Sequence, residues 1–356
     1  MRVVVTGASG NVGTAVVEAL VGDDTVTEVV GVARRRPSWA PPRTRWVACD
    51  LVQDDLEPVF RGADAVIHLA WIFQPTHDPL ATWVNNVGGA IRVFDAVGAA
   101  GVPALVHASS IGAYAPGPDE GRVDESWPTH AWPTAAYGRE KSYVERVLDG
   151  FERDHPDVRV VRLRPGFIFT RRAAEEQRRL FGGPFLPEVV LRRRLVPVVP
   201  DLPGLRFQAL HSTDAGEAFR LAAVRDVRGA FNVAAEPVLD AAALGRVLGA
   251  RPVRVPPRVA RAAVDALWRL HLVPASPYLL DLVLSLPVMD TTRAREELGW
   301  EPTVDATDAL AEVIDAMGKG EGGPTPPLAA DTGGPARLQE VATGVGQRAG
   351  VTPDGR

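Results

Sequence analysis

Two side chains that can move a proton stand four residues apart in the segment TAAYGREKSYVERVL, where Tyr137 and Lys141 lie on a predicted helix. That spacing places both on one helix face, where an ammonium can lower the pKa of a phenol by favouring the phenolate. A phenol with a tuned pKa can donate a proton to a carbonyl or take one from a hydroxyl. The alternative for the pair alone is an ordinary surface contact between residues one turn apart.

A glycine-rich segment at the start of the chain has the pattern of a phosphate-binding loop. Residues 3–13 read VVVTGASGNVG: a valine run typical of a strand buried on both faces, then glycines, then apolar residues at helical spacing. Gly7 can make a tight turn, Gly10 lets the backbone approach a pyrophosphate, and Gly13 allows the helix to pack close to the strand. The helix N-terminus offers N–H groups and partial positive charge to an anion. The segment therefore predicts nucleotide binding.

The elements that must position these residues alternate along the chain. Short valine-rich segments are separated by helix-length amphipathic ones, with strands expected at residues 28–33, 45–48, 65–70, 104–109, 158–164 and 229–234. This order predicts an α/β fold, a Rossmann-type doubly wound parallel sheet with right-handed crossovers. Ligands gather at the carboxyl ends of the strands in such a sheet.

The composition changes along the chain predict two domains and a tail. Residues 1–174 are expected to form the dinucleotide-binding domain, to which residues 206–235 return. Residues 175–205 and 236–317 are expected to form a smaller, mostly helical C-terminal substrate-binding domain. Residues 318–356 have too few large apolar side chains to offset the entropy of ordering, which predicts a disordered tail.

Composition excludes several classes of protein. With 39 basic and 44 acidic residues among 356, the net charge of −5 argues against a nucleic-acid-binding surface over the whole protein. A strand directly after Met1 leaves no room for a signal peptide, and no apolar segment approaches the roughly 20 residues that span a bilayer. A soluble cytoplasmic protein with no membrane partner is expected. The single cysteine, Cys49, excludes an internal disulfide and a thiolate zinc site, and no metal is expected.

Five motifs in order carry a resemblance to a known family. TGASGNVG follows the first strand, Asp50 the third, HLAW the fourth and SSIGAY the fifth, and YGREK lies on the next helix. In this order and spacing, from Met1 to about Pro302, the chain resembles the extended short-chain dehydrogenase/reductase superfamily and its NAD-dependent epimerase/dehydratase family. The resemblance implies hydride transfer by an NAD(P)-dependent oxidoreductase or epimerase. It also implies a homodimer joined through the helices near residues 81–99 and 135–154.

The resemblance assigns roles to individual positions. Tyr137 is implied as the catalytic acid/base, Lys141 as its pKa partner and a ligand of the nicotinamide ribose, and Ser110 as the hydroxyl that holds the substrate oxygen. Asp50 matches a carboxylate that binds the adenine amino group, with a helix or turn cap as the alternative. Asn86 matches an amide that shapes the active site, with helix packing as the alternative. The other implied cofactor-binding residues are Gly7, Ser9, Gly10, Asn11, Val12, Gly13, Leu51, Leu69, Ala70, Trp71 and Pro165.

The end of the second strand indicates which cofactor is bound. Here the segment reads GVARRRP, so Ala33 stands where an NAD enzyme of this kind carries an acidic residue. Arg34 and Arg35 follow and would meet a 2′-phosphate with positive charge. The prediction is NADP in preference to NAD, and the alternative is a solvated basic turn.

The substrate prediction rests on aromatic residues. Phe167 occupies a position where nucleotide-sugar relatives tend to carry asparagine, which argues against a sugar nucleotide. The aromatic residues expected near the pocket are Trp71, Phe73, Trp83, Phe167, Phe169 and Phe185. They favour a small-molecule alcohol or ketone of apolar or aromatic character, without excluding a sugar-derived one. The arginines at 171, 172, 178, 179 and 192–194 are expected to be solvated or to clamp a phosphate or carboxylate.

Two other functions remain open from the sequence. One is a non-catalytic NADP-binding regulator that senses redox state, and the other is an interaction scaffold with a vestigial site. Members of the superfamily that act as regulators tend to lose the tyrosine and the lysine, so the presence of Ser110, Tyr137 and Lys141 favours an enzyme. His68 is expected to be a core histidine, and His211 and Asp214 are expected to have structural and cofactor-adjacent roles.

Overall fold

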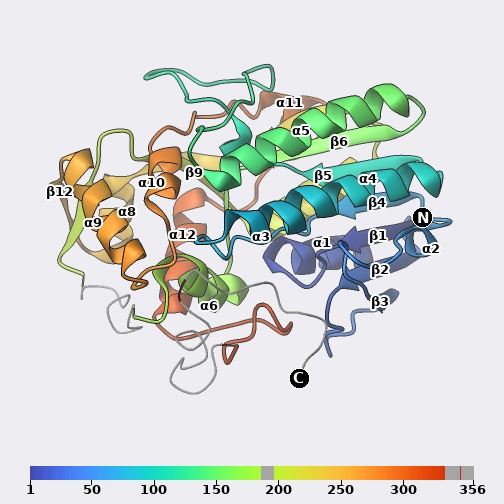
Figure 1. The fold of residues 1–356 in the computed structure, drawn as a ribbon, viewed down its shortest axis with the longest axis horizontal. Coiled ribbons are helices and arrows are strands. Elements are labelled where there is room, and N and C mark those ends of the chain that lie inside the picture. Colours follow the sequence, from blue (N-terminus) through green and yellow to red (C-terminus); the bar gives the residue numbers. More distant parts are fainter. Residues whose placement is uncertain (186–195, 333–344, 346–356) are drawn as a thin grey trace.

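A seven-stranded sheet forms the centre of the molecule (Figure 1). The computed structural model describes residues 1–185, 196–332 and 345. The strands lie in the order β10, β6, β5, β4, β1, β2, β3, and every neighbouring pair is parallel. Their bounds are β1 Arg2–Thr6, β2 Glu28–Ala33, β3 Thr44–Ala48, β4 Ala65–His68, β5 Ala104–Ala108, β6 Arg159–Pro165 and β10 Gly229–Val233. The predicted doubly wound parallel sheet is confirmed, and its strand order reverses between β1 and β4, where such folds bind ligands.

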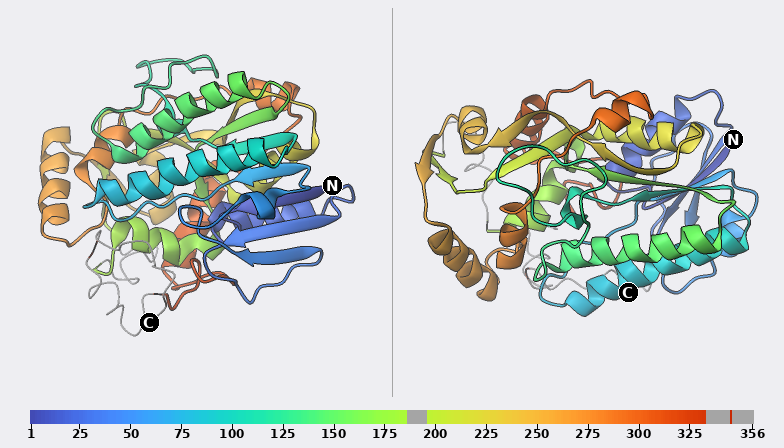
Figure 2. Two further views of the ribbon diagram at one scale, coloured as in Figure 1. Left: turned by 45° about the vertical axis from the view of Figure 1, so that its right-hand side comes forward. Right: turned by 90° about the horizontal axis from the view of Figure 1, so that it is seen from above.

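Helices cover both faces of this sheet because its strands are apolar on both sides (Figure 2). Val3 and Val5 of β1 pack in one core with α1 (Asn11–Val21) and α7 (Ser212–Val224). Val4 points the opposite way, into a second core on the other face of the sheet. The helices on this second face are α2 (Glu57–Phe60), α4 (Gly89–Ala99) and α5 (Ala136–Asp154), with α3 (Pro79–Trp83) leading through a π-helical turn at Val84–Gly88 into α4.

A smaller part of the molecule lies beyond the carboxyl edge of the large sheet. It contains a three-stranded sheet in the order β11 (Ala235–Asp240), β9 (Arg206–His211), β7 (Phe167–Phe169), and the pair β12 (Arg251–Arg254) and β8 (Val198–Asp201). Its helices include α6 (Ala174–Gln177), α8 (Ala241–Leu248), α9 (Pro257–Arg269), α10 (Pro277–Val283) and α12 (Ala306–Met317), while α11 (Thr292–Glu296) packs near β10. Within residues 206–235, β10 pairs in the large sheet and α7 packs on its face, whereas β9 pairs in the small sheet.

The structure differs from the disorder expected after residue 317. Residues 318–332 have a defined path, along which Thr325 and Leu328 are buried. The Thr325 hydroxyl donates to the carbonyl of Ser9 at 2.6 Å, in the glycine-rich loop. The segment needs no core of its own because it packs on a surface that already exists, and its prolines reduce the entropy lost on ordering. Of the rest of the predicted tail, residues 333–344 and 346–356 lie outside the described residues.

The described residues contain neither a membrane-spanning helix nor a cluster of metal-ligating side chains. In that part of the chain no helix is long and apolar enough to cross a bilayer. Nor do the same residues contain a group of three or more His, Cys, Asp or Glu side chains placed to hold a metal ion.

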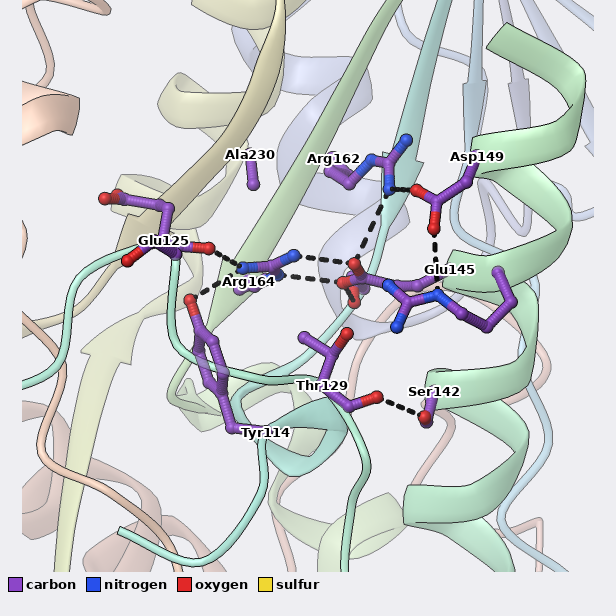
Figure 3. A network of polar contacts seen from close by, with 12 residues as sticks. Tyr114, Glu125, Thr129, Ser142, Glu145, Asp149, Arg162, Arg164 and Ala230 are labelled. Carbon is purple, nitrogen blue, oxygen red and sulfur yellow. Dashed lines mark hydrogen bonds and ion pairs between the residues drawn. The ribbon is translucent and has the colours of Figure 1, made fainter. Parts of the chain in front are cut away.

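A buried ion pair joins α5 to the large sheet (Figure 3). Glu145 of α5 is fully buried. Its carboxylate accepts hydrogen bonds from Nε and Nη2 of Arg164 on β6, at 2.8 and 2.6 Å. The Ser109 hydroxyl donates to the same carboxylate at 2.5 Å, and Arg162 Nη1 lies 3.7 Å from it. Burial alone raises the pKa of Glu145, but the hydrogen bonds and charge of Arg164, with Ser109 and Arg162, outweigh it and lower this pKa.

The same guanidinium extends the network to two further segments. Arg164 Nη1 donates to the Tyr114 hydroxyl at 2.9 Å, and that hydroxyl donates to Asn232 of β10 at 2.6 Å. The network therefore connects β5, α5, β6 and β10. It fixes α5 against the strand that precedes Ser110.

Replacing Arg164 by methionine should destabilise the protein strongly. The Arg164→Met variant leaves the Glu145 carboxylate buried without its main partner, which costs about 3–5 kcal/mol of unfolding free energy. Urea unfolding of the variant and the unchanged protein measures the difference. The control is Arg61→Met, at an exposed ion pair with Glu57, which should leave the urea midpoint nearly unchanged. Equal midpoints for Arg164→Met and Arg61→Met would show that the network adds little.

Candidate active site

A cavity of about 1010 Å³ lies at the carboxyl edge of the large sheet and extends into the smaller part of the molecule. It is bordered by the ends of β1, β2, β4 and β5, which are distant in sequence. All residues predicted to bind the cofactor or to act in catalysis border it: Gly7, Ser9, Gly10, Asn11, Val12, Gly13, Arg34, Arg35, Asp50, Leu51, Leu69, Ala70, Trp71, Asn86, Ser110, Tyr137, Lys141 and Pro165.

The three glycines of the glycine-rich loop differ in the space around them. Two of them have no room for a side chain, and the third faces open space at the cavity. Gly7 has a φ of +72°, and a Cβ there would lie 2.7 Å from the Ala70 backbone. A Cβ on Gly13 would lie 2.2 Å from the Gly7 carbonyl, so this glycine is required for helix packing. At Gly10 the nearest atom to an added Cβ is 3.5 Å away, and the position borders the cavity. The N-terminus of α1 begins here, so the loop fits the pyrophosphate of a dinucleotide.

The residues after β2 and β3 lie at the adenosine end expected for such a cofactor. Asp50 Oδ1 accepts a hydrogen bond from the Val52 N–H at 2.8 Å, so this side chain caps a turn while it borders the cavity. Arg34 and Arg35 are exposed at the cavity edge, and the preceding Ala33 carries no charge. The arrangement presents cations where a 2′-phosphate would lie.

Tyr137 lies in the first turn of α5 under an aromatic cover formed by the loop after β4. The Phe73 ring stacks on the Tyr137 ring with centroids 4.6 Å apart, and Trp71 meets that ring edge-on at 6.0 Å. Lys141 lies one turn further along α5, on the same face as predicted. Its Nζ donates to the Ala108 carbonyl at 2.8 Å and lies 3.4 Å from the Trp71 ring centroid.

Burial moves the pKa values of this pair in opposite directions. It raises the pKa of Tyr137 to about 12, opposed by a hydrogen bond with Ser110 and helped by the charge of Glu140. It lowers the pKa of Lys141 to about 7, opposed by the charges of Glu140 and Glu145. This direction for Tyr137 differs from the lowering expected from Lys141, because burial raises its pKa and Nζ lies 5.9 Å from its ring centroid. The phenol is therefore protonated at neutral pH and suited to donate a proton.

Asn86 connects the covering loop to α5. Its Nδ2 donates to the Ile72 carbonyl at 2.9 Å and to Glu140 Oε2 at 2.7 Å, while its Oδ1 accepts from the Ile72 N–H at 2.8 Å. Thr82 donates to the other oxygen of Glu140 at 2.6 Å. The Asn86 amide thus bonds the loop that carries Trp71 through Ile72 and bonds α5 through Glu140.

Glu140 is the residue that sequence reasoning missed at this site. It is buried next to Lys141, and burial raises its pKa while the bonds from Asn86 and Thr82 oppose the rise. Its spacing of three from Tyr137 was the available signal, because residues three apart share a helix face.

Several apolar side chains from the smaller part of the molecule border the cavity, beside the polar residues 176–179. Phe167, Phe169 and Phe207 border it from the small sheet, and Leu279 and Leu282 of α10 border it from the opposite side. Of the six aromatic residues predicted near the pocket, Trp71, Phe73, Phe167 and Phe169 border it. Trp83 and Phe185 do not border it and are exposed.

The arginines that follow β7 bind groups of the protein itself. Arg178 is buried and donates to Glu175 and to the Gly183 carbonyl, and Arg179 donates to the Pro327 carbonyl. Arg171 pairs with Glu321, and Arg172 pairs with Glu18. Residues 192–194 lie outside the described residues. One expected use of these arginines was to clamp a phosphate. Arg171 and Arg172 do not form such a clamp in this structure, because carboxylates of the protein hold them.

The C-terminal segment contributes residues that the sequence analysis placed in a disordered tail. Pro326, Pro327, Thr332 and Val345 border the cavity. The prolines in the PTPP sequence were the available signal, because they restrict the chain before it packs.

Three residues expected to have structural roles are held by polar contacts. His68 is buried, and its Nδ1 lies 2.7 Å from the Thr6 hydroxyl. His211 caps the start of α7 at Thr213. The Asp214 carboxylate accepts hydrogen bonds from the backbone N–H groups of residues 303 and 304, each at 3.0 Å.

Comparison with known proteins places these features in context. A family model described as the NAD dependent epimerase/dehydratase family matches residues 3–234. The L-arabinose 1-dehydrogenase (NAD(P)(+)) of Haloferax volcanii is 30% identical over 230 residues, which are 57% of this chain and 85% of that protein. The uncharacterized protein Rv2047c of Mycobacterium tuberculosis is 27% identical over 316 residues, which are 88% of this chain. The chain spans 29% of the length of that relative.

Solved structures give the same fold. The UDP-glucose 4-epimerase of Thermus thermophilus, in complex with NAD, has a TM-score of 0.65 and 22% sequence identity. The similarity covers 89% of this chain and 99% of that chain. At this identity the likeness concerns the fold.

The low pKa of Lys141 predicts a change in stability with pH. Between pH 7 and 10.5, the unfolded chain binds this proton more strongly than the folded protein. The cost of burying the charge is therefore complete below pH 7 and disappears as the pH rises to 10.5. The unfolding free energy of the unchanged protein should rise over this window relative to that of Lys141→Met.

Urea unfolding at several pH values in that window measures the difference. The control is Lys319→Met, at an exposed lysine, which should keep the pH profile of the unchanged protein. Parallel profiles for Lys141→Met and the unchanged protein would contradict the assigned pKa.

Proposed function

The chain belongs to the NAD-dependent epimerase/dehydratase family, and we propose that it is an NAD(P)-dependent oxidoreductase or epimerase that acts at a carbinol or carbonyl carbon, with Tyr137 as the acid/base. The observation that supports this most directly is that Ser110, Tyr137 and Lys141 border the same cavity as the glycine-rich loop. A non-catalytic redox-sensing regulator would have no need of this set. The enzyme is therefore preferred to the regulator.

Residues of the chain have separate tasks in this proposal. The loop at residues 7–13 and the N-terminus of α1 would hold the pyrophosphate, and Lys141 would hold the nicotinamide ribose. A bound nicotinamide supplies or accepts the hydride. During reduction of a ketone, the Tyr137 hydroxyl gives its proton to the substrate oxygen as the hydride adds to the carbon, and Ser110 steadies that oxygen by a hydrogen bond. Oxidation of an alcohol is the reverse.

The same residues serve net oxidation and epimerisation. Net reduction needs exchange of the cofactor, whereas epimerisation oxidises and re-reduces the substrate on one bound cofactor. The name of the Haloferax volcanii relative describes a dehydrogenase that uses NAD(P)(+), and that of the Thermus thermophilus neighbour describes an epimerase of UDP-glucose. Both reactions are retained in the proposal.

We propose that the smaller part of the molecule, residues 175–205 and 236–317, binds the substrate and that the substrate is an apolar or aromatic alcohol or ketone. Phenylalanines of the small sheet and leucines of α10 border the cavity. Arg178 also borders the cavity, but it is buried and its guanidinium already binds Glu175. An apolar group gains more from such a lining than a sugar phosphate does.

We also propose a homodimer. Leu80, Trp83 and Val84 are exposed near the start of α4, and Tyr143 is exposed on α5 beside Trp83, with ring centroids 4.9 Å apart. These helices are the ones expected to form the interface. An exposed apolar group of this kind is typical of a surface covered by a partner.

Replacing Tyr137 by phenylalanine tests the catalytic proposal. Because the substitution removes the hydroxyl and keeps the stacking on Phe73, Tyr137→Phe should bind NADPH as before and lose about 10²–10⁴-fold in turnover of a carbonyl substrate. NADPH consumption in a screen of ketones measures turnover, and the cofactor-induced rise in melting temperature measures binding. The control is Tyr143→Phe, at an exposed tyrosine of the same helix, which should keep full turnover. Unchanged activity in Tyr137→Phe would remove this residue from the mechanism.

Thermal shifts test the cofactor preference. NADPH should raise the melting temperature more than NADH at equal concentration, because Arg34 and Arg35 would meet the 2′-phosphate. Arg35→Asp should reduce the shift with NADPH and leave the shift with NADH nearly unchanged. Arg36→Asp is the control, since Arg36 is exposed and does not border the cavity. A larger shift with NADH in the unchanged protein would reverse the proposed preference.

A further inference from the structure

Helix α9 exposes an apolar stripe to solvent. None of its residues is buried, and Val259 and Leu267 are 59% and 40% exposed, as is Leu270 just after the helix, at 67%. Exposed alanines at 262, 263 and 266 lie between them. Because these residues are three or four apart, they lie on one face of the helix. This set, from Val259 to Leu270, is called the stripe below.

Polar and aromatic contacts hold the opposite side of α9 to the protein. Arg261 Nε lies 3.0 Å from both carboxylate oxygens of Asp281 on α10. Trp268 Nε1 donates to the Thr76 hydroxyl at 3.0 Å, and the Trp268 ring stacks on His77. A helix on a water-exposed surface ordinarily has its apolar residues on the inward side. In α9 the side with Arg261 and Trp268 is held to the protein, and the stripe from Val259 to Leu270 remains exposed.

The charge around this stripe is strongly positive. Residues 246–270 contain six arginines and one aspartate, a net charge of +5 in a chain whose net charge is −5. Two of these arginines are paired with carboxylates, Arg261 with Asp281 of α10 and Arg269 with Asp265. Arg251 and Arg254 are exposed on β12, on either side of the exposed Val253, and Arg258 and Arg269 are exposed at the two ends of α9. Such an apolar centre with a cationic rim is complementary to a lipid surface with anionic headgroups.

We propose that α9 and β12 form a docking face for an anionic phospholipid bilayer. The stripe from Val259 to Leu270 enters the boundary between headgroups and acyl chains, and Arg251, Arg254 and Arg258 contact lipid phosphates. The two elements lie together at the margin of the molecule, away from the N-terminus (Figures 1 and 2). Docking on the membrane surface needs no helix that spans the bilayer, and it differs from the expectation of no membrane partner, which rested on the lack of such a helix.

The docking face and the cavity are close neighbours. Helix α10 packs against α9, and its Leu279 and Leu282 border the cavity. An apolar substrate dissolved in the bilayer would have a short path to the site. That consequence rests on the proposed function, whereas the docking face itself does not.

Vesicle sedimentation of the full chain tests the proposal. The protein should bind vesicles of phosphatidylcholine with phosphatidylglycerol in low salt, and should bind vesicles of phosphatidylcholine alone much less. Binding should fall at high salt because the arginine contacts are screened. Absence of binding to the anionic vesicles in low salt would overturn the proposal.

Two pairs of substitutions separate the contributions of the stripe and its rim. The double variants Leu267→Glu with Leu270→Glu, and Arg254→Glu with Arg258→Glu, should each lower the vesicle partition coefficient at least about tenfold. All four side chains are exposed, so urea unfolding should be nearly unchanged, and either pair suffices if the other fails to fold. Arg61→Glu, a charge reversal at an exposed arginine outside this region, is the matched control and should keep full binding. Equal binding by both double variants and the control would overturn the proposal.

Light scattering distinguishes the bilayer from a second copy of the chain. If Leu267→Glu with Leu270→Glu lowers the subunit count, another copy covers the stripe and the lipid proposal is wrong. An unchanged subunit count with lost vesicle binding supports it. Turnover of a water-soluble ketone by the same variant should be unchanged, so failure here is distinct from failure of the Tyr137 mechanism.

Discussion

The geometry of the site depends on one buried carboxylate. Glu145 lies in the middle of α5 with no access to water, so its charge is tolerable only because Arg164 of β6 binds it through two hydrogen bonds. The same carboxylate holds Ser109, the residue before Ser110, while Tyr137 and Lys141 lie two turns and one turn earlier on the same helix. One ion pair thus sets the position of α5 relative to the end of β5. Of the three residues proposed for catalysis, Tyr137 and Lys141 lie on α5, and Ser110 lies two residues after the end of β5.

A second set of buried polar contacts positions the loop that covers Tyr137 and Lys141. Asn86 and Glu140 hold the loop after β4 against α5, and this loop places Phe73 on the Tyr137 ring and Trp71 on Lys141. Burial raises the pKa of the phenol and lowers the pKa of the ammonium, since it penalises the charged form of each. The acid/base state of the site therefore follows from packing around the pair, and the contact between its two members contributes less.

Both ends of the chain contribute to the cavity, and the smaller part of the molecule closes it. Thr325 binds the carbonyl of Ser9, so a segment near the C-terminus meets the glycine-rich loop near the N-terminus. The apolar wall formed by the small sheet and α10 supports the proposed substrate class, and α10 in turn holds α9 through Asp281. Trp268 on the same side of α9 stacks on His77, and the stripe from Val259 to Leu270 faces outward.

The sequence by itself determined the features that depend on near neighbours in the chain. The alternation of strands and helices predicted the parallel sheet, the glycines at 7, 10 and 13 predicted the loop, and a spacing of four predicted that Tyr137 and Lys141 share a helix face. Only the tertiary structure decided the direction of their pKa values, because the rings that bury them come from a loop more than sixty residues earlier in the chain. It also decided the partners of Glu140, the path of residues 318–332 and the outward direction of the α9 stripe. Periodicity shows that a helix has an apolar face, but which way that face points depends on the contacts made by its other side.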